Sequence, residues 1–403
     1  MCQKNVRKGI LYIIMNNDMI NKIVSRRESY MKNERNRTID FFRAVAILSV
    51  LFYHFYYLCN YPYQSIPVIH RILSSGGEIG VTLFFIISGY GICGSLMRME
   101  QTDGSVSWKK FMKKRFVRIL PQYYGSIIVL LLITSNSSYM NKKGLFDIGT
   151  HMLFIHNWFR STHGSINGVL WTMGTIFQFY IIAVWIYKCF KKNPYIVCIA
   201  SMIISIGLKA LFYHILVPRM NIDAFGNFVY ARQVFTALDN FVLGMLLCWV
   251  LTKYKSKSRK IHAVLGIIVT LGVFYKWNDL IDYHSPYGDD WWGYIWHTVF
   301  AVILTVLIYL CSQLNIQFKH IPGRIILWIS KYQYGTYIWH FIIAVSLLSN
   351  SSAAQVIARN SYIVFCIVMG GICLFAGYFS TIIFESVNYR EEIKKIKNDI
   401  LGR

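Results

Sequence analysis

The chain has 403 residues, of which 55% are hydrophobic and 16% aromatic, and its formal net charge is +24. The apolar residues occur in long blocks rather than periodic stripes, which predicts a polytopic membrane protein instead of two soluble domains. Most Lys and Arg residues fall in alternate loops, so the charge indicates membrane orientation and argues against nucleic-acid binding.

We predict an all-α fold of ten membrane-spanning helices. Their ranges are 39–59, 79–97, 116–134, 169–187, 195–217, 234–252, 261–275, 292–311, 332–348 and 362–385. The basic segments lie on the side of the N-terminus, so the positive-inside rule predicts that both termini are cytoplasmic. The nine cysteines are scattered without a CxxC pair. They predict neither a disulfide framework nor a metal site.

The membrane domain is predicted to span residues 38–386, between basic cytoplasmic segments 1–37 and 387–403. The N-terminal segment contains a short apolar patch followed by polar residues with no small-residue cleavage site. It therefore does not match a signal peptide. Met31 directly precedes KNERNRTIDFFRA and is an alternative start.

The first span carries ionisable residues on one helical face. Arg43 and His54 are eleven residues apart, which is close to three turns, so they share a face about 16 Å apart. Asp40 joins the same face one turn before Arg43. Ionisable groups inside a span are expensive unless they line a polar cavity, which favours a functional face. The structural alternative is an arginine that reaches lipid headgroups and a histidine bonded to a neighbouring helix.

The second and third spans add small and basic residues. Small side chains around Ser88, including Gly89 and Gly91, are typical of close helix packing. The basic run before Pro121 includes Lys114, Arg115 and Arg118. These cations either anchor lipid headgroups or hold the phosphates of an anionic cytosolic ligand, and composition does not separate the two.

Three histidines, His151, His156 and His163, lie in the predicted outer segment 135–168. Their spacing matches no zinc motif, so we interpret them as interfacial residues. The fourth span begins with Trp171 at its outer boundary and contains Gln178. His340 lies inside the ninth span, about a third of the way from the predicted cytoplasmic end. As a second histidine within a span, it favours a polar cavity shared with His54.

Five stretches together resemble the acyltransferase 3 family of bacterial membrane O-acyltransferases, from Asn36 to about Glu385. They are TIDFFRAVAILSVLFYHF, FFIISGY, KKRFVRILPQYY, LWTMGTIFQFY and YGTYIWHF. The resemblance implies about ten helices that move an acyl group, often acetyl, from cytosolic acyl-CoA to a hydroxyl on an extracytoplasmic or lipid-linked glycan.

The resemblance also assigns site residues. Arg43 and His54 match the first-helix pair of the family and are the candidate catalytic residues. The candidate substrate-binding residues are Asp40, Ser88, Lys114, Arg115, Arg118, Trp171, Gln178, Tyr180, Arg232 and His340. One position departs from the family, since Ile176 stands where many members have glutamate. Another group must then replace that carboxylate, or acceptor choice differs.

Acyl transfer to an alcohol needs a base and a positive environment for the oxyanion. His54 is the candidate base, and an acyl-imidazole relay through His54 is the alternative. Arg43 is too far from His54 to contact the same atom, so it fits the pantetheine arm or phosphates of the donor. The expected donor is acetyl-CoA or another acyl-CoA, with no metal.

We therefore predict a multi-pass O-acetyltransferase of the cytoplasmic membrane. Its expected partners are membrane lipid, a glycan or lipid-linked saccharide acceptor, and polysaccharide-biosynthesis proteins. A second hypothesis is a transporter or flippase that moves a small anion or lipid-linked sugar through the same cavity. The halves show no convincing internal repeat, which many transporters have. A third is an inactive family member used as an assembly scaffold.

Overall fold

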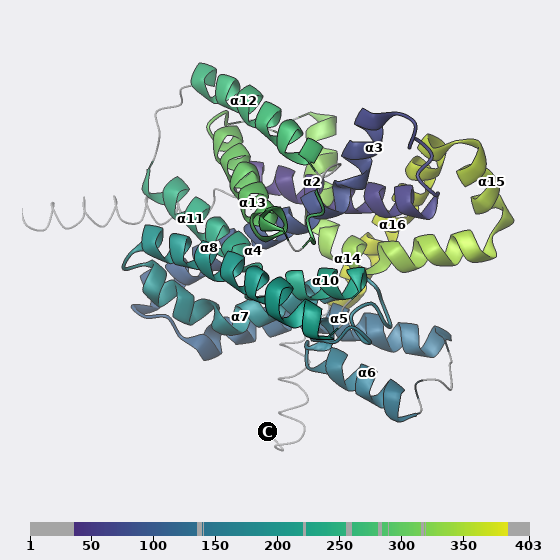
Figure 1. Ribbon diagram of the computed structural model, residues 1–403, viewed down its shortest axis with the longest axis horizontal. Coiled ribbons are helices and arrows are strands. Elements are labelled where there is room, and N and C mark those ends of the chain that lie inside the picture. The colour runs from purple at the N-terminus through teal and green to yellow at the C-terminus, as the bar shows by residue number, and fades with distance from the viewer. Residues whose placement is uncertain are drawn as a thin grey trace, which may run out of the picture. The chain divides into compact units, whose positions relative to one another are not determined.

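The computed structural model describes residues 36–134, 139, 141–220, 223–254, 260–280, 284–288, 290–315, 318 and 320–385 (Figure 1). The chain forms two units, residues 1–37 and 38–403, and only the second is described at length. The predicted start at Met31 and the tail 387–403 lie outside the described residues.

The described part of the second unit consists of helices joined by loops and has no strand, as the predicted all-α fold requires. Its long helices are α2 (Arg37–Leu58), α4 (Gly76–Asp103), α5 (Trp108–Thr134), α7 (Trp171–Phe190), α8 (Pro194–Leu211), α11 (Leu238–Lys253), α12 (Lys260–Asp279), α13 (Trp291–Ser312), α14 (Ile321–Asn350) and α16 (Tyr362–Glu385). Each corresponds to one of the ten predicted spans. Exposed apolar side chains such as Leu132, Ile203 and Ile367 cover the outside of the helices, which is typical of a surface in lipid.

Length and hydropathy mark eight helices of the described chain as able to cross a membrane, or nine if α14 and the helix after it form one span. The sixth predicted span, 234–252, is not among these helices: it corresponds to α11, which has only 16 residues. The helix after α14 is α15 (Ser352–Asn360), and the chain bends by 100° between them.

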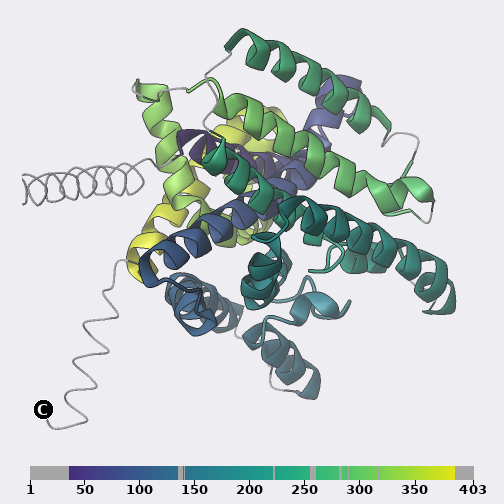
Figure 2. The same cartoon turned by 90° about the vertical axis from the view of Figure 1, so that its left-hand side faces the viewer.

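Short helices connect the spans. They are α3 (Pro67–Ser74), α6 (Lys142–Met152), η2 (His156–Trp158), η3 (Phe212–Leu216), α9 (Val217–Met220) and α10 (Ala224–Ala231). Helices α12 and α6 lie at opposite edges of the helical unit in both views (Figures 1 and 2). Helices α4 and α11 lie between those edges.

The predicted small-residue face of α4 divides between two neighbours. A Cβ atom on Gly89 would collide with the backbone carbonyl of Phe241 in α11, so glycine lets the two helices approach closely. Ser88 and Gly91 of the same stretch instead line a cavity. The packing explanation therefore holds for Gly89, and the neighbouring positions are open to a ligand.

Candidate functional site

His54 of α2 and His340 of α14 form a hydrogen-bonded pair. The Nδ1 atom of His54 lies 3.0 Å from Nε2 of His340 and 3.0 Å from the carbonyl oxygen of Val50. His340 is fully buried, and its Nδ1 atom lies 2.7 Å from the carbonyl oxygen of Tyr337. The two histidines that we expected within spans are therefore in direct contact.

These contacts fix the tautomers of the neutral pair. A carbonyl oxygen only accepts hydrogen bonds, so the Nδ1 atom of each ring must carry a hydrogen. The single Nδ1 hydrogen of His54 is then shared between the Val50 carbonyl oxygen and Nε2 of His340. Nε2 of His54 is left unprotonated, and the ring is partly exposed. His54 can therefore act as a base whose orientation is set by His340.

The position of His340 along its helix differs from the prediction. Helix α14 begins at Ile321, well before the predicted start at residue 332. The extension includes Arg324 and Lys331, which hydropathy reasoning assigned to a loop. His340 consequently lies in the second half of α14, where it meets His54 in the second half of α2.

A cavity of about 120 Å³ lies among α2, α4, α5, α7 and α14. Five residues predicted from the sequence line it: Arg43, Ser88, Arg115, Arg118 and Tyr180. Arginine is charged at every physiological pH, and its planar group binds phosphate with two hydrogen bonds. The cavity is therefore suited to a ligand that carries phosphate groups.

Two of the arginines are held by their neighbours. Nη1 of Arg43 lies 2.7 Å from Oδ1 of Asp40, which is fully buried. The guanidinium of Arg115 lies 4.9 Å from the ring centre of Phe111 and 5.3 Å from that of Tyr180. Aromatic faces attract cations and hold their direction. The arginine groups are thus positioned before any ligand arrives.

Tyr337 separates the cavity from the histidine pair. Its side chain lines the cavity, while its carbonyl oxygen bonds His340. The hydroxyl accepts from Thr172 at 2.8 Å and donates to the carbonyl of Val169 at 3.0 Å. Sequence reasoning missed Tyr337, although it lies in the YGTYIWHF stretch, because one tyrosine among several gives no distinguishing signal.

Ile176, the position at which the family resemblance implies glutamate, lines the cavity. It stands in the same wall as Tyr180 of α7 and Arg115 of α5. An isoleucine here leaves the positive charge of Arg115 and Arg118 without a local carboxylate. Within the described part of the chain, neither arginine forms an ion pair with Asp or Glu.

Three of the other predicted residues lie outside the cavity lining. Lys114 is exposed on α5. Trp171 stacks on His163 with ring centres 5.3 Å apart. Arg232 is buried in an ion pair with Glu78, which the sequence analysis did not single out.

Gln178, also predicted to bind substrate, instead bonds the loop before α7. Its Nε2 atom donates to the Phe154 carbonyl at 2.7 Å and to Oδ1 of Asn157 at 2.8 Å. Its Oε1 atom accepts from the Trp158 indole at 2.9 Å. In this arrangement Gln178 fixes the loop against α7.

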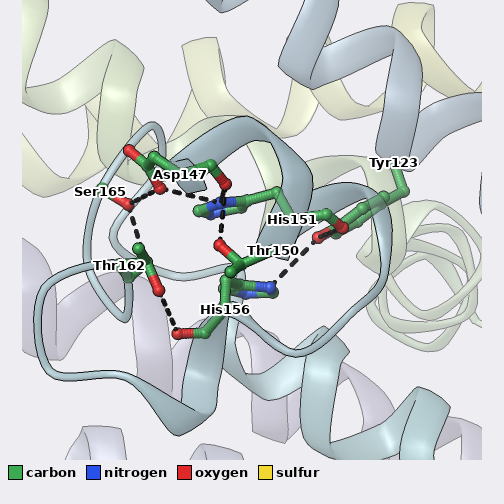
Figure 3. A network of polar contacts seen from close by, with 7 residues as sticks. All are labelled: Tyr123, Asp147, Thr150, His151, His156, Thr162 and Ser165. Atoms are coloured by element: carbon green, nitrogen blue, oxygen red, sulfur yellow. Dashed lines mark hydrogen bonds and ion pairs between the residues drawn. The ribbon is translucent and has the colours of Figure 1, made fainter. Parts of the chain in front are cut away.

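The same loop contains a polar network (Figure 3). His151 and His156 stack with ring centres 4.0 Å apart, and Nδ1 of His151 lies 3.2 Å from Oδ1 of Asp147. Ser165 donates to the same Asp147 oxygen at 2.6 Å. The network links α6, η2 and the segment that leads into α7.

The interfacial interpretation of the three histidines is wrong, because His151, His156 and His163 are 0%, 0% and 1% exposed. Hydrogen bonds to backbone carbonyls satisfy one nitrogen of His151 and one of His163, and they reduce the unfavourable free energy of burying these side chains. No group of His, Cys, Asp and Glu in the described residues could hold a metal ion.

Acidification is expected to loosen this loop, residues 141–170. Burial and the adjacent His151 lower the pKa of His156 to about 2, and burial lowers the pKa of His163 to about 4. Both side chains titrate near about 6.5 when unfolded, so the loop has its full stability above that pH and loses it below. At pH 5.5 the loss is on the order of 1 kcal/mol for each histidine.

The loss of loop stability is measured by hydrogen exchange of the loop amides at pH 7.5 and 5.5, corrected for the intrinsic exchange rate at each pH. The double variant His156→Gln and His163→Gln is expected to lose most of the acid sensitivity, whatever its protection at pH 7.5. Equal corrected protection of the natural chain at both pH values would contradict the prediction.

Comparison with known proteins gives a family match. Residues 36–380 match the sequence profile of the acyltransferase 3 family, described as an acyltransferase domain. No solved structure matches the chain.

Two curated relatives are O-acetyltransferases by name. The chain is 25% identical over 328 residues to the peptidoglycan O-acetyltransferase OatA of Listeria monocytogenes serovar 1/2a, covering 75% of this chain and 48% of the relative. It is 24% identical over 347 residues to a putative O-acetyltransferase of Staphylococcus aureus strain MSSA476, covering 78% and 51%. The chain thus spans about half the length of these relatives.

Proposed function

The chain belongs to the acyltransferase 3 family, and on this premise we propose that it transfers an acetyl group from acetyl-CoA to a hydroxyl of a surface glycan. One observation carries the proposal. The hydrogen bond between His54 and His340 leaves Nε2 of His54 as a free base beside an arginine-lined cavity.

The chemistry follows from the orientation of His54. Its Nε2 atom takes the proton of the acceptor hydroxyl while the hydroxyl oxygen attacks the thioester carbonyl. His54 becomes an imidazolium whose Nδ1 proton stays bonded to His340. The tetrahedral intermediate then expels the CoA thiolate, which takes the proton from Nε2 of His54. The C–S bond breaks, the ester C–O bond forms, and the enzyme returns to its starting state.

The donor enters from the arginine end of α2. A cavity of about 120 Å³ is small beside typical cofactor pockets of roughly 300–1,000 Å³, so it holds part of the donor. Arg43, Arg115 and Arg118 bind the phosphate-bearing part, and exposed Lys114 meets the nucleotide end. The thioester then passes Tyr337 to reach His54.

The acceptor is a glycan outside the cytoplasmic membrane or linked to lipid. The name of the Listeria relative, a peptidoglycan O-acetyltransferase, makes peptidoglycan the first acceptor to test. We place the protein in the cytoplasmic membrane with its termini inside, where it meets acyl-CoA. Polysaccharide-biosynthesis proteins are the expected partners.

A thiol-release assay tests the proposal. The purified protein is expected to release free CoA from acetyl-CoA only when a soluble glycan is present, with matching ester on the glycan. Soluble peptidoglycan fragments, freed of esters by mild alkali, serve as acceptor. If glycan crosses reconstituted vesicles without thiol release or ester formation, a transporter is favoured instead.

Replacing Arg43 is expected to weaken binding of the donor, acetyl-CoA, more than binding of the glycan acceptor. Arg43→Ala removes a charged contact from the cavity, so the KM for acetyl-CoA should rise about tenfold to a hundredfold. The KM for the glycan should change less than about threefold. Arg324→Ala, at the start of α14 and outside the cavity lining, is the matched control. A larger change in the glycan KM than in the acetyl-CoA KM would overturn the donor assignment.

A further inference from the structure

A second polar cluster lies near the start of α4, whereas the arginine cavity is lined by residues further along that helix, such as Ser88 and Gly91. Glu78, near the start of α4, forms an ion pair with Arg232 and accepts a hydrogen bond from the hydroxyl of Tyr287. Nε2 of His297 in α13 lies 3.6 Å from Oε2 of Glu78. We refer to Glu78, Arg232, Tyr287 and His297 as the Glu78 cluster.

The Glu78 cluster keeps hydrogen-bond groups without partners. Arg232 and His297 are 1% and 2% exposed. Among the described residues, Nη1 of Arg232 and Nδ1 of His297 have no hydrogen-bond partner. Buried donors of this kind are normally satisfied, because leaving them unpaired is unfavourable by about 1–3 kcal/mol each. The side chain of Glu78 is 19% exposed, so the cluster is not sealed from outside.

Tyr53 connects the Glu78 cluster with the catalytic histidine. A Cβ atom on Gly77 would meet the ring of Tyr53 at 2.9 Å, so the start of α4 rests on that ring. The rings of Tyr53 and His54 are neighbours, with centres 5.1 Å apart. Glu78 follows Gly77 directly in the chain. The Glu78 cluster is thus one side chain removed from the candidate base.

Aromatic rings form a wall beside the Glu78 cluster. The ring of Phe228 meets Tyr287 edge to face at 5.3 Å and Trp171 at 5.2 Å. The ring of Tyr287 lies 5.1 Å from that of His297. Apolar and aromatic walls with a few fixed polar groups are the usual lining of a small-molecule subsite.

We propose that the Glu78 cluster is the acceptor subsite, which binds one uncharged sugar unit of the glycan and presents its hydroxyl to His54. Arg232 and His297 donate hydrogen bonds to sugar oxygens, and Glu78 accepts one from a neighbouring sugar hydroxyl. Phe228, which is partly exposed and rests on Trp171, packs against the apolar face of the sugar. This assignment rests on the proposed acyl transfer.

Charge distinguishes this subsite from the donor cavity. In the Glu78 cluster the carboxylate neutralises Arg232, so little net charge attracts an anion. In the cavity, Arg115 and Arg118 have no carboxylate partner among the described residues. Phosphate groups therefore favour the cavity, and an uncharged polyol favours the Glu78 cluster. Glu78 also supplies an acceptor-side carboxylate in a chain that has Ile176 at the usual glutamate position.

Direct binding tests the subsite without relying on turnover. Fluorescently labelled peptidoglycan fragments, freed of esters, are titrated onto the purified protein without acetyl-CoA. Tyr287→Phe removes one hydroxyl from the cluster, and Glu78→Gln removes its negative charge. Each is expected to weaken fragment binding about tenfold, because Glu78 loses either its charge or the Tyr287 hydrogen bond that orients it. Acetyl-CoA binding, measured in parallel, should change less than twofold.

Tyr275→Phe, which alters a tyrosine at the end of α12 outside the cluster, is the matched control. Thermal melting of each variant identifies loss of fold, and Tyr287→Phe remains informative if Glu78→Gln unfolds. The subsite would be overturned if Tyr287→Phe bound fragments as tightly as the natural chain, or if it lost acetyl-CoA binding as much as fragment binding. It would also be overturned if the natural chain bound no fragment. If fragments bind through the cluster but no acetyl group is transferred, the proposed acyl transfer fails and the sugar site stands.

Discussion

His54→Ala is expected to lower acetyl transfer by at least about a thousandfold, within the range for a missing general base. The variant lacks the base that takes the proton from the acceptor hydroxyl, and His340 cannot replace it because its side chain is fully buried. Acetyl-CoA binding should remain near its normal value, since the arginine cavity does not include His54. Radiometric transfer to glycan and equilibrium binding of acetyl-CoA measure the two effects.

Two further variants separate the roles of the histidines. His340→Ala should reduce turnover by about tenfold to a hundredfold and shift its pH profile, because His54 loses the group that orients it. His70→Ala changes a histidine that bonds the hydroxyl of Tyr56 outside the pair, and it is the matched control. Transfer by His54→Ala at more than a tenth of the normal rate would remove His54 from the mechanism.

Gly91→Leu is expected to weaken acetyl-CoA binding by at least about a hundredfold, equivalent to about 2.7 kcal/mol. Gly91 lines the cavity, and a Cβ atom there would have no heavy atom within 4 Å. A leucine side chain can therefore enter a space of about 120 Å³ without moving its neighbours. Leucine also has a higher helix propensity than glycine, so α4 should remain intact. Fragment binding at the Glu78 cluster should not change.

The same substitution at two other glycines gives two controls, one expected to change nothing and one expected to lower the stability of the fold. Gly207→Leu adds the side chain on an exposed part of α8 with nothing nearby, and acetyl-CoA binding should be unchanged. Gly89→Leu collides with the Phe241 carbonyl, so α4 and α11 must separate and stability should fall by about 1–3 kcal/mol. Thermal melting tests both. Normal acetyl-CoA affinity in folded Gly91→Leu would contradict the donor cavity.

The helices were predictable because apolar length is a strong signal in a membrane chain. The helix ends were less predictable. Helix α14 begins at Ile321 and includes Arg324 and Lys331, two charged residues that hydropathy excludes from a span. Helix α11 has 16 residues and falls below the usual length of a span. In both cases local hydropathy does not report where the helix begins and ends.

The site was predictable where helical periodicity applies. The spacing of Arg43 and His54 placed them on one face of α2, and the structure puts Arg43 in the cavity and His54 at the histidine pair. The contact between His54 and His340 depends on the packing of α2 against α14. No spacing in a single sequence encodes that contact.

Other polar residues were misread because polarity alone does not report burial. His151 and His156 were interpreted as interfacial residues but are buried, and the Asp147 carbonyl bonds only one nitrogen of His151. Glu78 stood in an ordinary loop-to-helix junction, and only the fold brings Arg232 and Tyr287 to it. Long-range pairing of this kind becomes visible only in the folded chain.

The central claim is that this chain places acetyl esters on a surface glycan through His54. The most direct measurement is the acetate ester content of surface polysaccharides from cells that lack the protein and from cells complemented with the natural chain or His54→Ala. We predict that ester is lost without the protein and restored by the natural chain but not by His54→Ala. Equal ester content in every fraction, or full restoration by His54→Ala, would contradict the account.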